Sequence, residues 1–110
     1  MRDATIVGAG LTRFGKFPDA TLRTMAHEAI AAALADAGIL PHDVQAVFSG
    51  NAIAGLMTGQ EMVRGQVVTR SIGLSGIPVV NVENACASGS TAVHLASTAV
   101  ASGQYDLVLA

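Results

Sequence analysis

The chain has 110 residues, of which 51% are hydrophobic and only 13% are charged, and its formal net charge is -2. This composition excludes an intrinsically disordered chain, and the lack of a basic cluster argues against a nucleic-acid partner. A single cysteine excludes an internal disulfide framework and a multi-thiolate metal site, so no metal centre is predicted. So few charges are unusual for a free-standing domain of this size. We therefore expect part of the surface to be covered, by further chain or in a tight oligomer.

No segment predicts a membrane span or a secretory signal. The longest apolar stretch, residues 29–40, is interrupted by Asp36 and Gly38 and is shorter than the roughly 18 residues that a span requires. The N-terminus lacks the charged region and long apolar region of a secretory signal. We expect a cytoplasmic protein with a reduced cysteine and no membrane association.

The first half of the chain predicts two strands and one long helix. Residues 4–7 favour a short strand followed by a glycine-containing turn and a loop. A helix is then predicted between a cap at Thr21 or Asp19 and a stop at Gly38. Its apolar residues recur at spacings of three and four: Leu22, Met25, Ala26, Ala29, Ile30, Ala33, Leu34 and Ala37. Residues 44–48 predict the second strand.

The second half continues this alternation. Residues 49–59 predict a loop and residues 60–72 a moderate helix. Residues 79–82 form a strand that is apolar on both faces, as in a buried parallel sheet. Residues 85–102 predict a second strong helix, and residues 105–110 begin a fourth strand. The pattern predicts an α/β fold with right-handed βαβ units and a mostly parallel sheet covered by helices. Because the chain stops within an apolar strand, we expect it to be incomplete.

The turn at residues 8–10, Gly-Ala-Gly, does not predict a dinucleotide site. The dinucleotide-binding motif needs a third glycine at position 13 and a helix that opens at once. Position 13 is Arg13, and Pro18 lies between the turn and the first helix. We interpret residues 8–10 as a tight turn after a strand.

Cys86 is the strongest chemical signal in the sequence. The chain leaves a buried strand, makes a short turn and is predicted to place Cys86 in the first turn of the next helix. Free N–H groups and the helix dipole there favour a thiolate, and they can hydrogen-bond a developing oxyanion. Two interpretations follow. Cys86 is a small buried hydrophobe, or it is a nucleophile whose own backbone N–H is a candidate oxyanion donor.

Two segments resemble the thiolase family. Residues 84–92, Asn-Ala-Cys-Ala-Ser-Gly-Ser-Thr-Ala, are similar to the acylation-site segment of thiolases. Residues 6–16 resemble the family's start, particularly in the sterol-carrier-protein type and its microbial relatives. The resemblance runs through nearly all 110 residues. Glu83 departs from the asparagine that many biosynthetic and degradative thiolases carry at this position, which favours the sterol-carrier-like branch and leaves the substrate open.

The resemblance implies a thiolase-like fold, in which residues 1–110 would form an incomplete N-terminal domain. It implies that Cys86 attacks an acyl-CoA thioester and holds the acyl group during reversible 3-ketoacyl-CoA thiolysis or Claisen condensation. The family's catalytic histidine and second cysteine would lie outside this chain, so we predict that the 110 residues alone are inactive. The resemblance also implies CoA thioesters as substrates with no bound cofactor, a role in lipid metabolism, and a homodimer or homotetramer.

Two alternatives stay open. A ketoacyl synthase or a hydroxymethylglutaryl-CoA-synthase-like condensing enzyme shares the fold and a cysteine at a helix start. A thiolase-like scaffold or lyase subunit would lack acyl-transfer chemistry. The start of the chain and the residues around Cys86 fit a thiolase better than either.

The three histidines, His27, His42 and His94, match no catalytic position. His94 follows Cys86 by eight residues, which places it about 80° around a helix and two turns away, so contact is not expected. We interpret all three as structural or solvated residues.

Four other residues have two interpretations each. Met57 and Met62 are adaptable core filling or, by the resemblance, part of an interface at the rim of the site. Arg64 and Arg70 could meet CoA phosphates, but solvation at the surface is the interpretation we favour.

Overall fold

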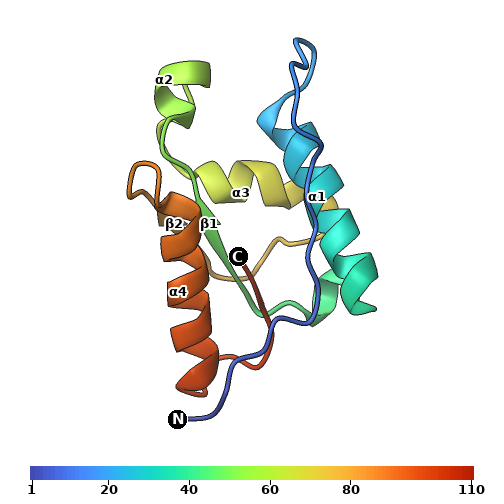
Figure 1. Ribbon diagram of the computed structural model, residues 1–110, viewed down its shortest axis with the longest axis vertical. Coiled ribbons are helices and arrows are strands. Elements are labelled where there is room, and N and C mark those ends of the chain that lie inside the picture. The colour runs from blue at the N-terminus through green and yellow to red at the C-terminus, as the bar shows by residue number, and fades with distance from the viewer.

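The computed structural model describes residues 1–110 and places three strands in one parallel sheet (Figure 1). The strands are β1 (Ala46–Gly50), β2 (Val79–Val82) and β3 (Val108–Leu109). Their order is β2-β1-β3, so β1 lies in the centre, with Phe48 opposite Val80 and Val47 opposite Leu109. The predicted α/β class and parallel sheet are confirmed, but the sheet has three strands where the sequence predicted four.

Helices cover both faces of this sheet. The α-helices are α1 (Leu22–Ala37), α2 (Ala54–Thr58), α3 (Arg64–Thr69) and α4 (Ser88–Ala101), and single 3-10 turns lie at Pro41–Asp43 and Arg70–Ile72. In Figure 1, α1 and α4 flank the strands on opposite sides, and α2 projects from the end of β1. The predicted loop at 49–59 thus contains a short helix, and the predicted helix at 60–72 begins only at Arg64.

The core is divided in two by β1, because successive side chains of a strand point to opposite faces. Val47 packs on the α1 side, in a cluster with Ile30 and Leu34 of that helix. Ala46 and Phe48 point to the other side, where they pack against three small buried residues of α4: Ala92, Ala96 and Ala99. The apolar periodicity of both long helices therefore marks the faces that meet the sheet.

The ends of α1 follow the predicted capping residues. Thr21 is the N-cap, and its side-chain oxygen accepts a hydrogen bond from the Thr24 N–H. Gly38 closes the helix with a φ of 69°, a left-handed conformation that glycine adopts at little cost.

The predicted strand at residues 4–7 is wrong, because the segment forms no ladder with the sheet. β1 has a neighbour on each side, and the outer edges of β2 and β3 pair with no part of residues 4–7. The segment instead runs along α1 (Figure 1). Gly8 and Gly10 lie so close to the α1 backbone at Ala33 and Ala29 that neither position has room for a side chain. Ala9 N–H also donates to the Asp36 carboxylate at 3.0 Å.

Arg2 fastens the start of the chain to its other end. Its guanidinium donates to the carbonyl oxygens of Val100 at 2.8 Å and Tyr105 at 2.6 Å. It also pairs with the Asp106 carboxylate at 2.9 Å. These contacts hold the N-terminal segment beside the C-terminal end of α4.

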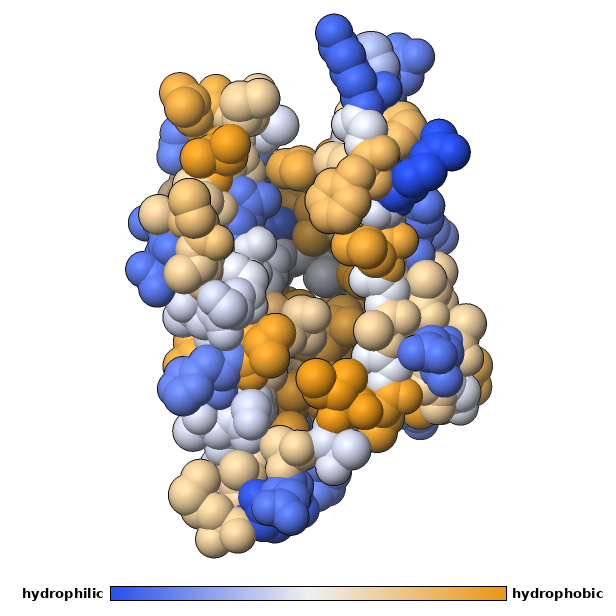
Figure 2. All heavy atoms as spheres, viewed as in Figure 1, coloured by the Kyte–Doolittle hydropathy of each residue, from blue (hydrophilic) through white to orange (hydrophobic).

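Much apolar surface remains uncovered. Only 15 of the 110 residues are buried, and large hydrophobic side chains are exposed along the N-terminal segment and around α2. Figure 2 shows these apolar side chains over the tip formed by α2 and along the N-terminal segment. No helix combines the length and the apolar character that crossing a bilayer demands. The low charge of the sequence therefore matches a surface that other protein groups could cover.

Candidate functional site

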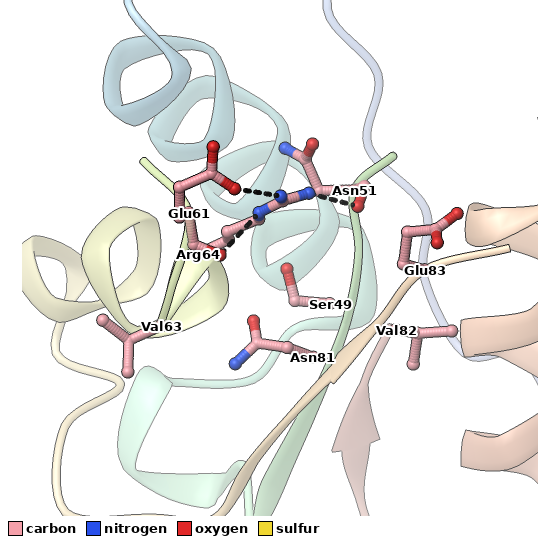
Figure 3. Close-up of a pocket in the computed structure, with 8 residues that line it drawn as sticks. All are labelled: Ser49, Asn51, Glu61, Val63, Arg64, Asn81, Val82 and Glu83. Carbon is pink, nitrogen blue, oxygen red and sulfur yellow. Dashed lines mark hydrogen bonds and ion pairs between the residues drawn. The ribbon is translucent and has the colours of Figure 1, made fainter. Parts of the chain in front are cut away.

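The site lies where β1 and β2 end, at the carboxyl edge of the sheet. A cavity of about 320 Å³ opens there between the two strand ends and the segment that leads into α3 (Figure 3). Its lining is mostly polar and consists of Ser49, Asn51, Glu61, Val63, Arg64, Asn81, Val82 and Glu83. Ligands of parallel α/β sheets usually bind at this edge.

Arg64 ties the end of β1 to the segment after α2. Its guanidinium donates to the backbone carbonyl oxygen of Asn51 at 3.0 Å and to that of Glu61 at 3.3 Å. The Glu61 carboxylate lies 3.7 Å away, and only 19% of the Arg64 side chain is exposed. The prediction of a solvated surface arginine is wrong for Arg64, because the chain folds over its guanidinium. Arg70 is exposed, as predicted.

Two asparagines complete this side of the edge. The Asn51 side chain accepts hydrogen bonds from the N–H groups of Ile53 and Ala54, which starts α2. The Asn81 side chain accepts from Gly65 N–H at 2.6 Å and donates to the Gln66 side chain at 2.8 Å, which holds α3 against β2. Sequence analysis missed these residues. The available signal was their place at or just after the ends of two predicted strands.

A second cavity, of about 310 Å³, lies on the other side of the β1 end. Ser49, Gly50 and Asn51 border it together with parts of α1 and of the N-terminal segment. The close contact of Gly10 with α1 brings the N-terminal segment to this edge of the sheet.

Cys86 stands on the turn between β2 and α4, and its side chain is exposed. The structure corrects its predicted place: α4 begins at Ser88 with Ala87 as N-cap, so Cys86 lies just before the helix and not in its first turn. Ala85 causes the difference, because its φ of 47° turns the backbone out of the helical path. The exposure also contradicts the interpretation of Cys86 as a buried hydrophobe.

Side chains on both sides of Cys86 fix this turn. Ala85 N–H donates to the Glu83 carboxylate at 2.5 Å. The buried Ser88 hydroxyl accepts from Asn84 N–H at 2.8 Å and donates to the Ala85 carbonyl oxygen at 2.7 Å. Asn84 further donates from its side chain to Thr91 on α4 at 3.0 Å. The turn that presents Cys86 is therefore a defined structure despite its exposure.

The N–H groups around Cys86 are available to a ligand. Those of Cys86, Gly89 and Ser90 donate to no other group of the chain. A side chain at Gly89 would meet nothing within 4 Å, so the space above the start of α4 is open. Such N–H groups beside an exposed thiol can hydrogen-bond an oxyanion.

Two residues with a strained backbone lie at the same edge. Val63 and Ala85 are the non-glycine residues with positive φ, each at 47°. Val63 lines the cavity, and Ala85 precedes Cys86. Left-handed backbone costs an alanine or valine free energy and is common at functional sites.

The remaining candidates do not line either cavity. His27, His42 and His94 are exposed and do not line the cavities at the strand ends. Met57 and Met62 are exposed as well, so core filling is wrong for both. No group of three or more histidine, cysteine or acidic side chains could hold a metal ion.

Several known proteins are similar to this chain in sequence and in fold. An acetyl-CoA acetyltransferase of Methanothermobacter thermautotrophicus is 41% identical over 110 residues, which is 100% of this chain and 28% of that protein. Sterol carrier protein 2 of Gallus gallus is 37% identical over 116 residues, covering 99% of this chain and 19% of that protein. The solved structure of an Ltp2-ChsH2(DUF35) aldolase superposes with a TM-score of 0.63 at 29% identity, covering 92% of this chain and 25% of that one.

This chain thus spans little more than a quarter of the acetyltransferase that it matches over its whole length. Residues 4–110 match the family model described as the thiolase N-terminal domain, and they include both the turn that carries Cys86 and the cavity beside it. The chain belongs to the thiolase family.

Proposed function

We propose that this chain is the N-terminal part of a thiolase-type acyltransferase and that Cys86 is its acyl-accepting nucleophile. The substrates would be CoA thioesters, which thiolases use. The observation that carries the proposal is the exposed Cys86 thiol on a strained, hydrogen-bonded turn, beside N–H groups that have no partner.

The proposed first step is a thioester exchange. The Cys86 thiolate attacks the carbonyl carbon of an acyl-CoA, and the carbonyl oxygen becomes an oxyanion within reach of the free N–H groups. A carbon–sulfur bond to Cys86 forms as the bond to the CoA sulfur breaks. The proton lost by Cys86 ends on the CoA thiol. In condensation, a second acyl-CoA loses an α-proton, and its α-carbon attacks the acyl carbon, so a carbon–carbon bond forms as the bond to Cys86 breaks. In thiolysis, the Cys86 thiolate instead attacks the 3-keto carbon of a 3-ketoacyl-CoA. The bond from that carbon to the α-carbon breaks, the α-carbon takes a proton, and the acyl group then passes from Cys86 to the thiol of a second CoA.

The direct test is acylation of Cys86 in the intact protein. We expect incubation with acetyl-CoA to add an acetyl mass to the peptide that contains Cys86, detected by mass spectrometry. Cys86→Ser should lose this adduct and lower thiolysis by about three orders of magnitude or more, because the nucleophile itself is removed. Both proteins should unfold at the same temperature, since the side chain is exposed. Full activity in Cys86→Ser, or no adduct in the wild type, would contradict the proposal.

A lyase or scaffold subunit of the same family is the second candidate. The similarity to the Ltp2-ChsH2(DUF35) aldolase favours it over unrelated functions. Such a subunit should form no acyl adduct on Cys86, so the same experiment separates the two candidates. A condensing enzyme should form the adduct but should fail to cleave 3-ketoacyl-CoA with CoA.

We propose further that these 110 residues form an incomplete domain and do not catalyse thiolysis alone. The exposed apolar surface and the 28% coverage of the acetyltransferase support this. No histidine of the chain lines the cavity beside the Cys86 turn, so a histidine base would have to come from elsewhere. Thiolysis by the purified 110-residue chain would contradict this proposal.

A further inference from the structure

Glu83 belongs to two parts of the site at once. It lines the polar cavity between the β1 and β2 ends, and its carboxylate accepts the Ala85 N–H at 2.5 Å. It is the first residue after β2 and stands three positions before Cys86. Glu83 therefore connects the sheet edge to the turn that presents the thiol.

Ala85, whose N–H donates to Glu83, has a left-handed backbone conformation that is unfavourable for alanine. Ala85 has a φ of 47°, where the Cβ atom of an L-residue crowds the backbone. Such a conformation persists only when surrounding contacts hold it. At the carbonyl side of Ala85, the contacts are the N–H and the hydroxyl of Ser88. At the amide side, the one contact is the Glu83 carboxylate.

We propose that Glu83 is a positioning residue that holds Ala85 in the left-handed conformation and thereby directs Cys86 out of the helical path. The inference rests on the proposed role of Cys86 as the acyl acceptor. In this arrangement Glu83 acts on the backbone and needs an acceptor oxygen rather than a negative charge. A neutral glutamine can supply that oxygen, whereas an alanine cannot.

The test uses the intact protein and the single-turnover rate of Cys86 acetylation at saturating acetyl-CoA. We expect Glu83→Ala to lower this rate about tenfold, as the loss of one hydrogen bond would do, with little change in the acetyl-CoA concentration that gives half the maximal rate. Glu83→Gln should stay within about threefold of the wild type. Glu28→Ala is the matched control, because Glu28 is an exposed acid on α1 whose side chain takes part in none of the ion pairs.

A second variant isolates the backbone conformation. Glycine adopts a positive φ readily, so Ala85→Gly added to Glu83→Ala should restore most of the lost rate. A merely structural role of Glu83 would not be repaired by removing a methyl group two residues away. The inference is overturned if Glu83→Ala acetylates at the wild-type rate, if glutamine fails to rescue, or if Ala85→Gly fails to restore the rate.

Amide exchange separates failure of this inference from failure of the proposed function. We expect the Ala85 N–H to exchange with solvent about tenfold faster in Glu83→Ala than in the wild type, measured by NMR. An unchanged exchange rate overturns the inference whether or not an adduct forms. Faster exchange in a protein whose wild type forms no adduct supports the hydrogen bond and overturns the acyl-acceptor role.

Discussion

The ends of β1 and β2 lie side by side at one edge of the sheet, but the chain continues from them in different ways. After β1, the Asn51 side chain accepts the N–H of Ala54 at the start of α2, and the Asn51 carbonyl oxygen accepts a hydrogen bond from the half-buried Arg64. After β2, the backbone turns through Ala85 and leaves Cys86 and its N–H exposed. The polar groups at the β1 end bond within the chain, whereas past the hydrogen-bonded turn after β2 the N–H groups of Cys86, Gly89 and Ser90 have no partner in the chain.

This difference indicates that the two strand ends have different roles in the site. The β1 end and α3 form a wall whose hydrogen bonds are already made, so it can stay fixed while a ligand binds. The β2 end carries the groups that have no partner in the chain and that chemistry could use. Four substitutions test whether the two ends are as distinct as the structure suggests.

The largest effect is expected at Gly50, where the two ends touch. A Cβ there would lie 2.5 Å from the Ser88 carbonyl oxygen, a backbone atom that cannot move aside cheaply. We expect Gly50→Ala to destabilise the intact protein by about 3 kcal/mol, measured by urea denaturation, and to lower Cys86 acetylation. Gly89→Ala is the control, because its Cβ meets nothing and it should be neutral or stabilising. Equal stability of the two variants would contradict the close approach.

The next effect is expected at Ser88, whose buried hydroxyl serves both Asn84 and Ala85. Ser88→Ala leaves the Asn84 N–H without its partner, so we expect a loss of about 2 kcal/mol in the same measurement. The exposed Ser90 bonds only to the Ala87 carbonyl oxygen, and Ser90→Ala should cost less than about 0.5 kcal/mol. If Ser90→Ala proves the more damaging change, the described network is wrong.

A smaller effect is expected at Arg64, on the wall beside the cavity. Arg64→Met removes the hydrogen bonds to the carbonyl oxygens of Asn51 and Glu61, and we expect a loss of about 1 to 2 kcal/mol in stability. The rate of Cys86 acetylation should change less than in Glu83→Ala. Arg70→Met is the control, because Arg70 is exposed, and it should change neither the stability nor the rate of Cys86 acetylation. A slower acetylation without loss of stability would assign Arg64 to ligand binding, and it would contradict the view that the β1 end only forms a fixed wall.

The smallest effect is expected at Glu61. Its carboxylate lies 3.7 Å from Arg64, and 71% of its side chain is exposed, so water and salt screen the pair. Glu61→Gln should change the unfolding midpoint by an amount equivalent to less than about 0.5 kcal/mol. A larger, salt-dependent loss would show that Arg64 depends on this ion pair rather than on the backbone carbonyl oxygens.

The same contrast explains how much of the molecule the sequence predicts. The bounds of the strand at 79–82 and the helix ends at Thr21 and Gly38 were predicted correctly, because strand and capping residues leave local patterns. The expected burial of that strand is wrong, because β2 lies at the edge of the sheet and none of its residues is buried. The segment at 4–7 has the apolar pattern of a strand but packs on α1, and no local pattern distinguishes pairing with a sheet from packing on a helix.

The site shows the same limit. The composition of the turn singled out Cys86, but its place outside α4 depends on the left-handed Ala85, which residue types alone do not indicate. The burial of Arg64 depends on how residues 51–63 fold back over it. Neither the left-handed turn at Ala85 nor the contact of Arg64 with a carbonyl oxygen 13 residues away leaves a pattern of residue types in the sequence.

The anchoring of Arg2 has a consequence for how the chain acquires its structure during synthesis. Its side chain binds the Val100 and Tyr105 carbonyl oxygens, partners that are 98 and 103 residues away in sequence. These contacts cannot form until residues 100–105 have left the ribosome. Because translation adds about 5 to 20 residues per second, the Arg2 contacts are missing for several seconds, while the contact of Ala9 with Asp36 can already form, so the start of the chain is held on α1 before it is fastened to the end of α4.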